Sequence, residues 1–230
     1  MNEMVWRQSI AETGFAILPA VFSRESVDRL LKEISELQPR RSRAGVRHAL
    51  GLAPVDALAR QPLLLNLARV VLGAEAFPYR ATLFDKTPTA NWLVVWHQDT
   101  ALPLCGRLDL PGWGPWSVKE GIHYAHAPAA ALSQVLALRV HLDDSGERNG
   151  PLRVPPRTHN SGVLGDDTLH DLSTRIIPVD CVCAKGGVVA MRPLVVHASS
   201  KSQTGMPRRV LHIEYAASAC IAEPLELAIA

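Results

Sequence analysis

The first third of the chain predicts two amphipathic helices. One begins after Ser23, whose hydroxyl suits an N-cap, and it carries Glu25 and Asp28 near its start, where a helix favours negative charge. The second runs from Pro62, a good first-turn residue, through an apolar stretch to Gly73, a common helix terminator. The apolar residues of the first helix recur at helical spacing, at Val27, Leu30, Leu31, Ile34 and Leu37.

After Phe77 the pattern changes to short β-prone runs separated by Gly, Pro, Asn and Asp. Most of these runs have no helical periodicity between them, which is typical of a β-sandwich or barrel. We therefore expect a mainly β protein with flanking N-terminal helices. The eight predicted strands cover residues 79–84, 92–96, 136–142, 151–154, 176–182, 188–191, 195–197 and 209–215.

The chain shows no internal repeat and no low-complexity linker, so residues 1–230 are predicted to form a single domain. Residues 1–76 would be a helical N-terminal support, and residues 77–217 would be the β core. The segment 101–128 is rich in Gly, Pro and Trp and is too long for a simple turn. Because loops of that length are usually lids or binding loops, we expect it to cover an active site.

Composition narrows the classes of function. The 230 residues are 47% hydrophobic and 20% charged, which excludes a disordered or fibrous chain. The net charge of +2, with no aromatic series among the basic residues, argues against nucleic acid as a partner. No apolar window approaches the roughly 18 residues of a membrane span, and Glu3, Arg7 and Glu12 precede any apolar run, unlike a signal peptide. We expect a cytoplasmic protein without a membrane or protein partner.

The cysteines are predicted to be reduced, because four of them in a chain of this size do not make a disulfide framework. Cys181 and Cys183 could hold a soft metal, since residues i and i+2 share one face of a strand. Their apolar surroundings favour ordinary packing instead.

Candidate metal ligands come from the histidines. If one of them belongs to a metal site, that site needs two imidazoles and one carboxylate on one face of the metal, with the other positions open for ligand and oxygen. His97 and Asp99 follow a strand-like run and can point the same way, and His197 ends a comparable run. Arg208 follows His197 by eleven residues, where a guanidinium could clamp a carboxylate. The spacing alone equally fits core histidines and a turn aspartate.

Four segments in this order resemble the phytanoyl-CoA dioxygenase family of iron(II)- and 2-oxoglutarate-dependent oxygenases. They are W-H-Q-D (96–99), N-G-P-L-R-V-P-P-R-T-H (149–159), V-H-A-S (196–199) and P-R-R-V-L-H-I-E-Y (207–215). The resemblance covers roughly residues 79–215 and implies a double-stranded β-helix, the jelly-roll core of cupin-like proteins. In the second segment Arg157 stands where the family usually has glycine.

The resemblance also assigns roles to residues. His97, Asp99 and His197 match the family's iron ligands. Arg208 matches the arginine that binds the distal carboxylate of 2-oxoglutarate, with Arg209 as the alternative if the register shifts by one, and Ser199 matches a hydroxyl that assists it.

The activity that the resemblance implies uses iron(II), 2-oxoglutarate and O2. It hydroxylates an aliphatic C–H of a small molecule or acyl substrate and releases succinate and carbon dioxide. Asp99 favours hydroxylation, because halogenating relatives have a small residue at the matching place. Two other functions stay open: a cupin-like metal-dependent isomerase or hydrolase, and a non-catalytic carboxylate-binding module.

Gln98, Trp116 and Arg47 are candidate substrate contacts. Gln98 lies between two candidate ligands, and Trp116 falls in the expected lid, although core packing explains it equally well. The basic cluster after the first helix could meet an acidic substrate, a CoA phosphate or 2-oxoglutarate, and a solvated loop is the alternative. This cluster comprises Arg40, Arg41, Arg43, Arg47 and His48.

Two further histidine and acid pairs resemble the candidate metal motif. His141 and Asp143 end a strand at a predicted turn, where aspartate is expected to bond the backbone. His212 and Glu214 lie inside the last long strand, and we interpret them as an inward-facing pair.

Overall fold

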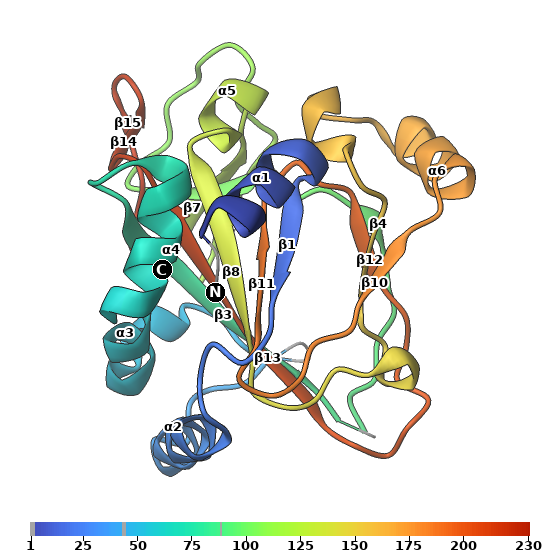
Figure 1. The fold of residues 1–230 in the computed structure, drawn as a ribbon. Coiled ribbons are helices and arrows are strands. Elements are labelled where there is room, and N and C mark those ends of the chain that lie inside the picture. The colour runs from blue at the N-terminus through green and yellow to red at the C-terminus, as the bar shows by residue number, and fades with distance from the viewer. Residues whose placement is uncertain (1–2, 43–44, 88) are drawn as a thin grey trace.

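Two antiparallel sheets face each other across the middle of the computed structural model, which describes residues 3–42, 45–87 and 89–230 (Figure 1). The large sheet has the order β1 (Phe15–Leu18), β11 (Val188–Met191), β8 (Val135–His141), β13 (Arg208–Ala216), β3 (Phe77–Lys86) and β2 (Gly45–Val46). The smaller sheet has the order β10 (Val179–Cys181), β9 (Leu152–Val154), β12 (His197–Ser199) and β4 (Val94–His97). The predicted jelly-roll fold class is confirmed.

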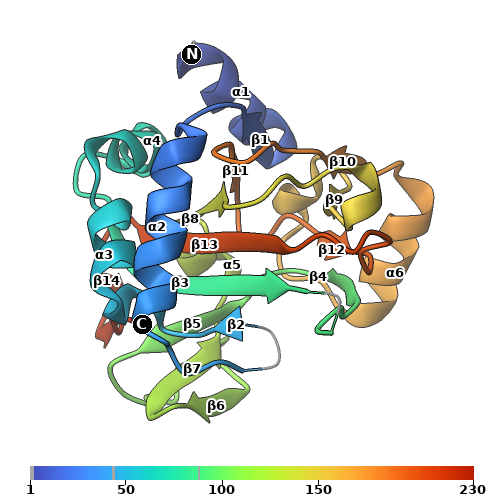
Figure 2. The same ribbon diagram turned by 90° about the horizontal axis from the view of Figure 1, so that it is seen from below.

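Residues alternate between the two faces of the large sheet along β3, β13 and β8. Leu83, Leu138 and Leu211 belong to the main hydrophobic core on its outer face. This face is covered by the helices α2 (Arg24–Glu36), α3 (Ala53–Ala59) and α4 (Pro62–Leu72), and Figure 2 shows α2 lying across β3 and β13. The inner face carries the polar residues of the same strands, and it faces the smaller sheet.

Both predicted helices are present. Ser23 caps α2, its hydroxyl oxygen accepting a hydrogen bond from the backbone N–H of Ser26, and α4 begins at Pro62. The sequence did not reveal α1 (Glu3–Thr13) or α3. Nor is the N-terminal part only a helical support, since β1 pairs with β11 and β2 pairs with β3 at the two edges of the large sheet. Strands of four and two residues are too short to show a periodic pattern.

The segment 101–128 is not a continuous loop. It contains a three-stranded antiparallel sheet of β5 (Ala101–Leu104), β7 (Ile122–His126) and β6 (Trp116–Lys119). The prediction that this segment is a lid is untested. The other elements are α5 (Ala129–Leu132), α6 (Asp166–Arg175), the 3-10 turns η1 (Ala49–Gly51), η2 (Glu147–Asn149) and η3 (Thr158–Ser161), and the hairpin β14 (Cys220–Ala222) and β15 (Leu225–Glu226). No helix in the described ranges is long and apolar enough to cross a bilayer.

The turn around Arg157 keeps a conformation that suits glycine. Arg157 has a φ of 71°, in the left-handed region where glycine has no steric penalty. Its backbone N–H donates to the carbonyl of Thr13 at 2.9 Å, which ties the turn to the end of α1. Arg157, which stands where the family usually has glycine, therefore still adopts the left-handed backbone conformation, at the cost of some strain.

His141 should make the metal-free protein sensitive to acid. Its side chain is buried on β8, and neither ring nitrogen has a hydrogen-bond partner among the described residues. Burial, and then the charges of Arg139 and Arg208, lower its pKa to about 3. The unfolded chain binds this proton near pH 6.5 and the folded protein does not, so this histidine destabilises the fold as pH falls from about 6.5 towards 3.

We therefore expect His141→Leu to reduce the loss of unfolding free energy between pH 7 and pH 4.5, measured by urea denaturation of the metal-free protein. The slope that one such histidine contributes is at most about 1.4 kcal/mol per pH unit. His170→Gln, on the exposed face of α6, is the control. An unchanged pH dependence in His141→Leu would show that this side chain does not contribute to the acid sensitivity.

Candidate metal centre

His97 and His197 are brought together by strand pairing. They are direct cross-strand neighbours in the antiparallel pair of β4 and β12, although 100 positions separate them in the sequence. Their ring centroids lie 4.2 Å apart. Asp99 follows β4 by two residues, and its backbone N–H donates to the carbonyl of Pro193 at 2.9 Å, just before the second histidine strand. The smaller sheet thus fixes the two histidines, and a backbone hydrogen bond between the adjoining loops fixes Asp99.

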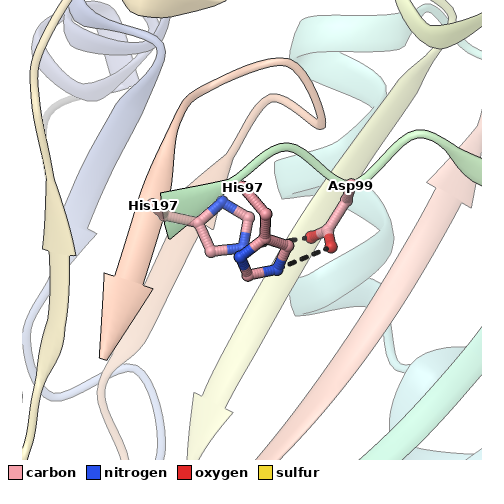
Figure 3. Close-up of side chains that lie close together, drawn as sticks. All are labelled: His97, Asp99 and His197. Carbon is pink, nitrogen blue, oxygen red and sulfur yellow. Dashed lines mark ion pairs between the residues drawn. The ribbon is translucent and has the colours of Figure 1, made fainter. Parts of the chain in front are cut away.

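The three side chains converge on one point (Figure 3). The Nε2 atom of His97 lies 3.6 Å from Oδ1 of Asp99, and Nε2 of His197 lies 3.5 Å from Oδ2. One ligand atom from each residue falls within 4.8 Å of the other two. Within the described part of the chain, this is the one group of three or more His, Cys, Asp or Glu side chains with that property.

Backbone carbonyls orient both imidazoles. Nδ1 of His97 donates to the carbonyl of Val95, and Nδ1 of His197 donates to the carbonyl of Val195, each at 2.9 Å. These bonds place the proton on Nδ1 and leave the Nε2 lone pairs directed at the carboxylate of Asp99. Two ring nitrogens and a carboxylate oxygen that face one another can bind one metal ion together. Two neutral imidazoles and one carboxylate are the donor set of non-haem iron sites, so these residues fit the metal that the sequence implies.

Electrostatics favour the ligand forms of two of these groups. Burial, together with the nearby His97, lowers the pKa of His197 to about 4. Burial alone would raise the pKa of Asp99, but His197 and His97 outweigh it and hold that pKa well below its usual range. For His97, the hydrogen bond and charge of Asp99 overcome burial and raise the pKa. Asp99 is therefore ionised and His197 neutral at neutral pH.

The neighbouring acid, Glu214, already has partners and does not complete this group. It forms a close ion pair with Arg80 and accepts a hydrogen bond from the hydroxyl of Tyr79 at 3.2 Å. His212 faces inward, as expected, with its Nε2 4.0 Å from Oδ2 of Asp99. It lies beside the candidate ligands rather than among them.

A cavity of about 450 Å³ opens beside this group, against the inner face of the large sheet. The register of β3 with β13 places Lys86 opposite Arg208 and Thr82 opposite His212. The register of β13 with β8 places Arg139 on the other side of His212. The residues that line the cavity include the three candidate ligands, Arg139 beside His212, and a group formed by Lys86, Ser199 and Arg208.

Arg208 and Arg209 have different surroundings. The NH2 group of Arg208 donates to Oγ of Ser199 at 3.2 Å inside the cavity. The guanidinium of Arg209 instead makes two hydrogen bonds, each 2.7 Å long, to the carboxylate of Asp143. Asp143 also accepts a hydrogen bond from the backbone N–H of Arg209 at 2.9 Å, so it bonds backbone as predicted, but on strand β13. The structure places Arg208, not Arg209, beside Ser199.

Lys86 was not among the residues singled out from the sequence. Its Nζ donates to Oγ of Ser199 at 2.7 Å and to the carbonyl of Ser200 at 2.9 Å. Burial, and then Arg208 and Arg139, lower its pKa to about 7. The alternation along β3, in which Arg80, Thr82, Phe84 and Lys86 share one face, was the available signal.

The three candidate substrate contacts lie outside the cavity lining. The amide of Gln98 donates to the carbonyls of Gly162 and Leu194 and accepts from the N–H of Leu164, so it links three segments of backbone. Trp116 packs against the hydrophobic cluster near the C-terminal hairpin, and Arg47 is exposed. Their role as substrate contacts stays a prediction.

The basic cluster is not a single surface. Arg41 pairs closely with Asp85, and Nε2 of His48 lies 2.9 Å from the hydroxyl of Tyr124. Arg40 is exposed, and Arg43 lies outside the described residues.

The alternative cysteine site is not supported. Cys181 and Cys183 are buried within a hydrophobic cluster between the sheets, and burial raises the pKa of both thiols to about 12. They therefore pack as neutral thiols at neutral pH.

Comparison with known proteins agrees with the sequence motifs. Residues 10–210 match the family model described as phytanoyl-CoA dioxygenase. The chain is 26% identical over 184 residues to an L-proline trans-4-hydroxylase of Streptomyces griseoviridis, covering 69% of this chain and 61% of that protein. It is 29% identical over 168 residues to an ectoine dioxygenase of Bordetella parapertussis, covering 66% of this chain and 48% of that protein. The chain thus spans about half to three fifths of the length of these relatives.

Solved structures share the fold. The iron-bound EctD of S. alaskensis superposes with a TM-score of 0.69 at 19% identity, covering 97% of this chain and 85% of that chain. AviO1 of Streptomyces viridochromogenes superposes with a TM-score of 0.68 at 22% identity, covering 94% and 95%.

The phytanoyl-CoA dioxygenase family depends on iron(II), 2-oxoglutarate and O2. These are the cofactors that the four sequence segments imply, so the cofactor prediction is confirmed. The family model covers most of the chain and includes every segment between the first helix and the long strand β13. This protein belongs to the phytanoyl-CoA dioxygenase family.

Proposed function

We propose that this protein is a non-haem iron(II)- and 2-oxoglutarate-dependent dioxygenase that hydroxylates an aliphatic C–H of a small molecule or acyl substrate, with release of succinate and carbon dioxide. The observation that carries the proposal is one cavity with two chemically distinct ends. At one end Nε2 of two imidazoles and an ionised carboxylate converge. At the other, buried cations face the cavity without a carboxylate partner among the described residues.

His97, Asp99 and His197 would hold the iron, which supplies the oxidation of the C–H bond when 2-oxoglutarate and O2 are present. The carbonyls of Val95 and Val195 hold both rings through Nδ1, with the two Nε2 atoms aimed inward. Because His197 is neutral and Asp99 ionised, neither needs to lose a proton before metal binds. The chain's own contribution is thus a preorganised set of donors with a fixed tautomer.

The distal carboxylate of 2-oxoglutarate would bind Arg208 and Ser199. The Oγ atom of Ser199 accepts from both Lys86 and Arg208, so its own proton is available to donate to a carboxylate oxygen. Nε of Arg208 is buried and lacks a partner in the described structure. Burial, and then repulsion from Arg139, lower the pKa of Arg208 to about 10, which marks a cation that lacks its counter-charge. An incoming carboxylate would supply it.

The curated relatives support hydroxylation of a small molecule, because their names describe a hydroxylase of L-proline and a dioxygenase of ectoine. A cupin-like isomerase or hydrolase would use the same three metal ligands, but it needs no 2-oxoglutarate, so the buried cations of the cavity would have no function in it. A carboxylate-binding module would need those cations but not the converging ligand atoms. We also propose a cytoplasmic location, which the four free cysteines support.

The ligand assignment predicts the outcome of an anaerobic titration of iron(II), followed by 2-oxoglutarate, into the metal-free protein. The wild type should develop the weak visible charge-transfer band of a chelated iron complex. His97→Ala and Asp99→Ala should lose the band, because each removes one of three donors. His170→Ala, an exposed histidine on α6, is the matched control and should keep it. A full band in either ligand variant would contradict the assignment.

The carboxylate assignment predicts different effects for two adjacent arginines. Arg208→Gln should weaken 2-oxoglutarate binding by about 2–5 kcal/mol, roughly thirtyfold or more, because it removes the charged partner of a buried carboxylate. Arg209→Gln should change it less than about threefold, since that side chain is held by Asp143. Equilibrium binding of radiolabelled 2-oxoglutarate to the metal-loaded variants measures both. A larger effect for Arg209→Gln would reverse the register.

A further inference from the structure

Arg139 is a buried cation for which the proposed function gives no role. It lies on β8 opposite His212 and is 7% exposed. Its NH1 group donates to Nδ1 of His212 at 2.9 Å, and its guanidinium carbon lies 5.5 Å from the centre of the Phe84 ring. Its Nε atom has no partner, and no carboxylate of the described residues forms an ion pair with it. Arg139 is one of the residues that line the cavity.

Arg139 and Arg208 belong to different parts of the cavity. Arg208 is opposite Lys86 at one end of β13, whereas Arg139 is opposite His212, four residues further along the same strand. At about 3.3 Å per residue, the four-residue separation along β13 corresponds to roughly 13 Å between the backbone positions of Arg208 and His212. His212 links Arg139 to the metal end, because its Nε2 lies 4.0 Å from Oδ2 of Asp99. Arg139 is therefore placed near the candidate metal, and Arg208 away from it.

The charges in the cavity leave Arg139 uncompensated even when the cofactors are bound. Arg80 already pairs with Glu214, so Lys86, Arg139 and Arg208 are the cations left facing the cavity among the described residues. A divalent metal opposite Asp99 adds further positive charge, and 2-oxoglutarate brings two negative charges. The filled site keeps a net positive charge even with Lys86 neutral. A buried charge without a partner is costly, so a second anion is expected here.

We propose that the primary substrate carries a carboxylate and that Arg139 binds it beside the metal. This inference rests on the proposed function and names the substrate class of that same site. A guanidinium can hold a carboxylate through two parallel hydrogen bonds, which also orients the substrate. Leu93, just before β4, and Val95 of β4 line the same cavity and are 58% and 68% exposed. They offer apolar contacts to the part of the substrate that is not the carboxylate. The fitting substrate is a small carboxylic acid with an aliphatic part.

Pairs of acids and their primary amides test this substrate class without knowledge of the natural substrate. The probes are propionate and propionamide, hexanoate and hexanamide, and L-proline and L-prolinamide. They are offered to the zinc-loaded protein with saturating 2-oxoglutarate, and binding is followed by saturation-transfer NMR. The wild type should bind at least one acid and bind its amide about tenfold or more weakly, because only the acid supplies the charge.

Variants separate the substrate site from the co-substrate site. Arg139→Gln should weaken acid binding about tenfold or more while changing the dissociation constant of 2-oxoglutarate less than about threefold, and this unchanged constant also shows that the variant is folded. Arg139→Lys, which keeps the charge, should retain part of the acid binding. Arg175→Gln, an exposed arginine paired with Asp171 on α6, is the matched control and should behave as the wild type.

Two results would overturn the inference while leaving the proposed function intact. One is a wild type that binds 2-oxoglutarate normally but does not distinguish any acid from its amide. The other is an Arg139→Gln variant that loses 2-oxoglutarate binding as strongly as Arg208→Gln, which would assign Arg139 to the co-substrate. A wild type that binds no 2-oxoglutarate would contradict the proposed function and this inference together.

Discussion

The pairing of β4 with β12 is the interaction on which the candidate site depends. It places His97 directly opposite His197, and the carbonyls two residues before each histidine hold both rings in the same tautomer. Asp99 is fixed to the loop before the second strand by its backbone N–H. Since both imidazoles and the backbone of Asp99 are held by hydrogen bonds to the backbone, little conformational freedom has to be lost when a cation binds.

The inner face of the large sheet supplies the opposite end of the same cavity. Alternation along β3, β13 and β8 sends apolar residues to the helix-covered core and polar ones inward. Among the inward residues, Arg80 is neutralised by Glu214, whereas Arg139 and Arg208 are not neutralised by any described residue. Folding thus places positively charged side chains on the inner face of the large sheet, opposite the candidate metal-binding residues. Only bound anions balance this charge. The proposed co-substrate and the proposed substrate carboxylate follow from this one electrostatic requirement.

The sequence pointed to the candidate metal ligands and to Arg208 through four ordered segments that resemble the family. The local pattern alone was not enough, because His97 and Asp99 at a strand end fit a core histidine and a turn aspartate equally well. The alternation along β3 places Lys86 on the inner face, but the positions of Lys86 and Arg139 beside the candidate site come from the register between strands more than 50 residues apart in the sequence. In the same way, β1 and β2 are too short for a periodic pattern and become strands only by pairing with longer ones. Gln98 is adjacent to two candidate ligands in sequence, yet its side chain is directed at backbone groups outside the cavity.

The most direct test of the account is an anaerobic crystal structure of the protein with iron(II) and 2-oxoglutarate, with anomalous data collected on both sides of the iron absorption edge. The account predicts one strong iron peak bonded to Nε2 of His97, Nε2 of His197 and a carboxylate oxygen of Asp99. It also predicts the distal carboxylate of 2-oxoglutarate against Arg208 and Ser199. An iron peak at other residues, or no peak between these three side chains, would contradict it.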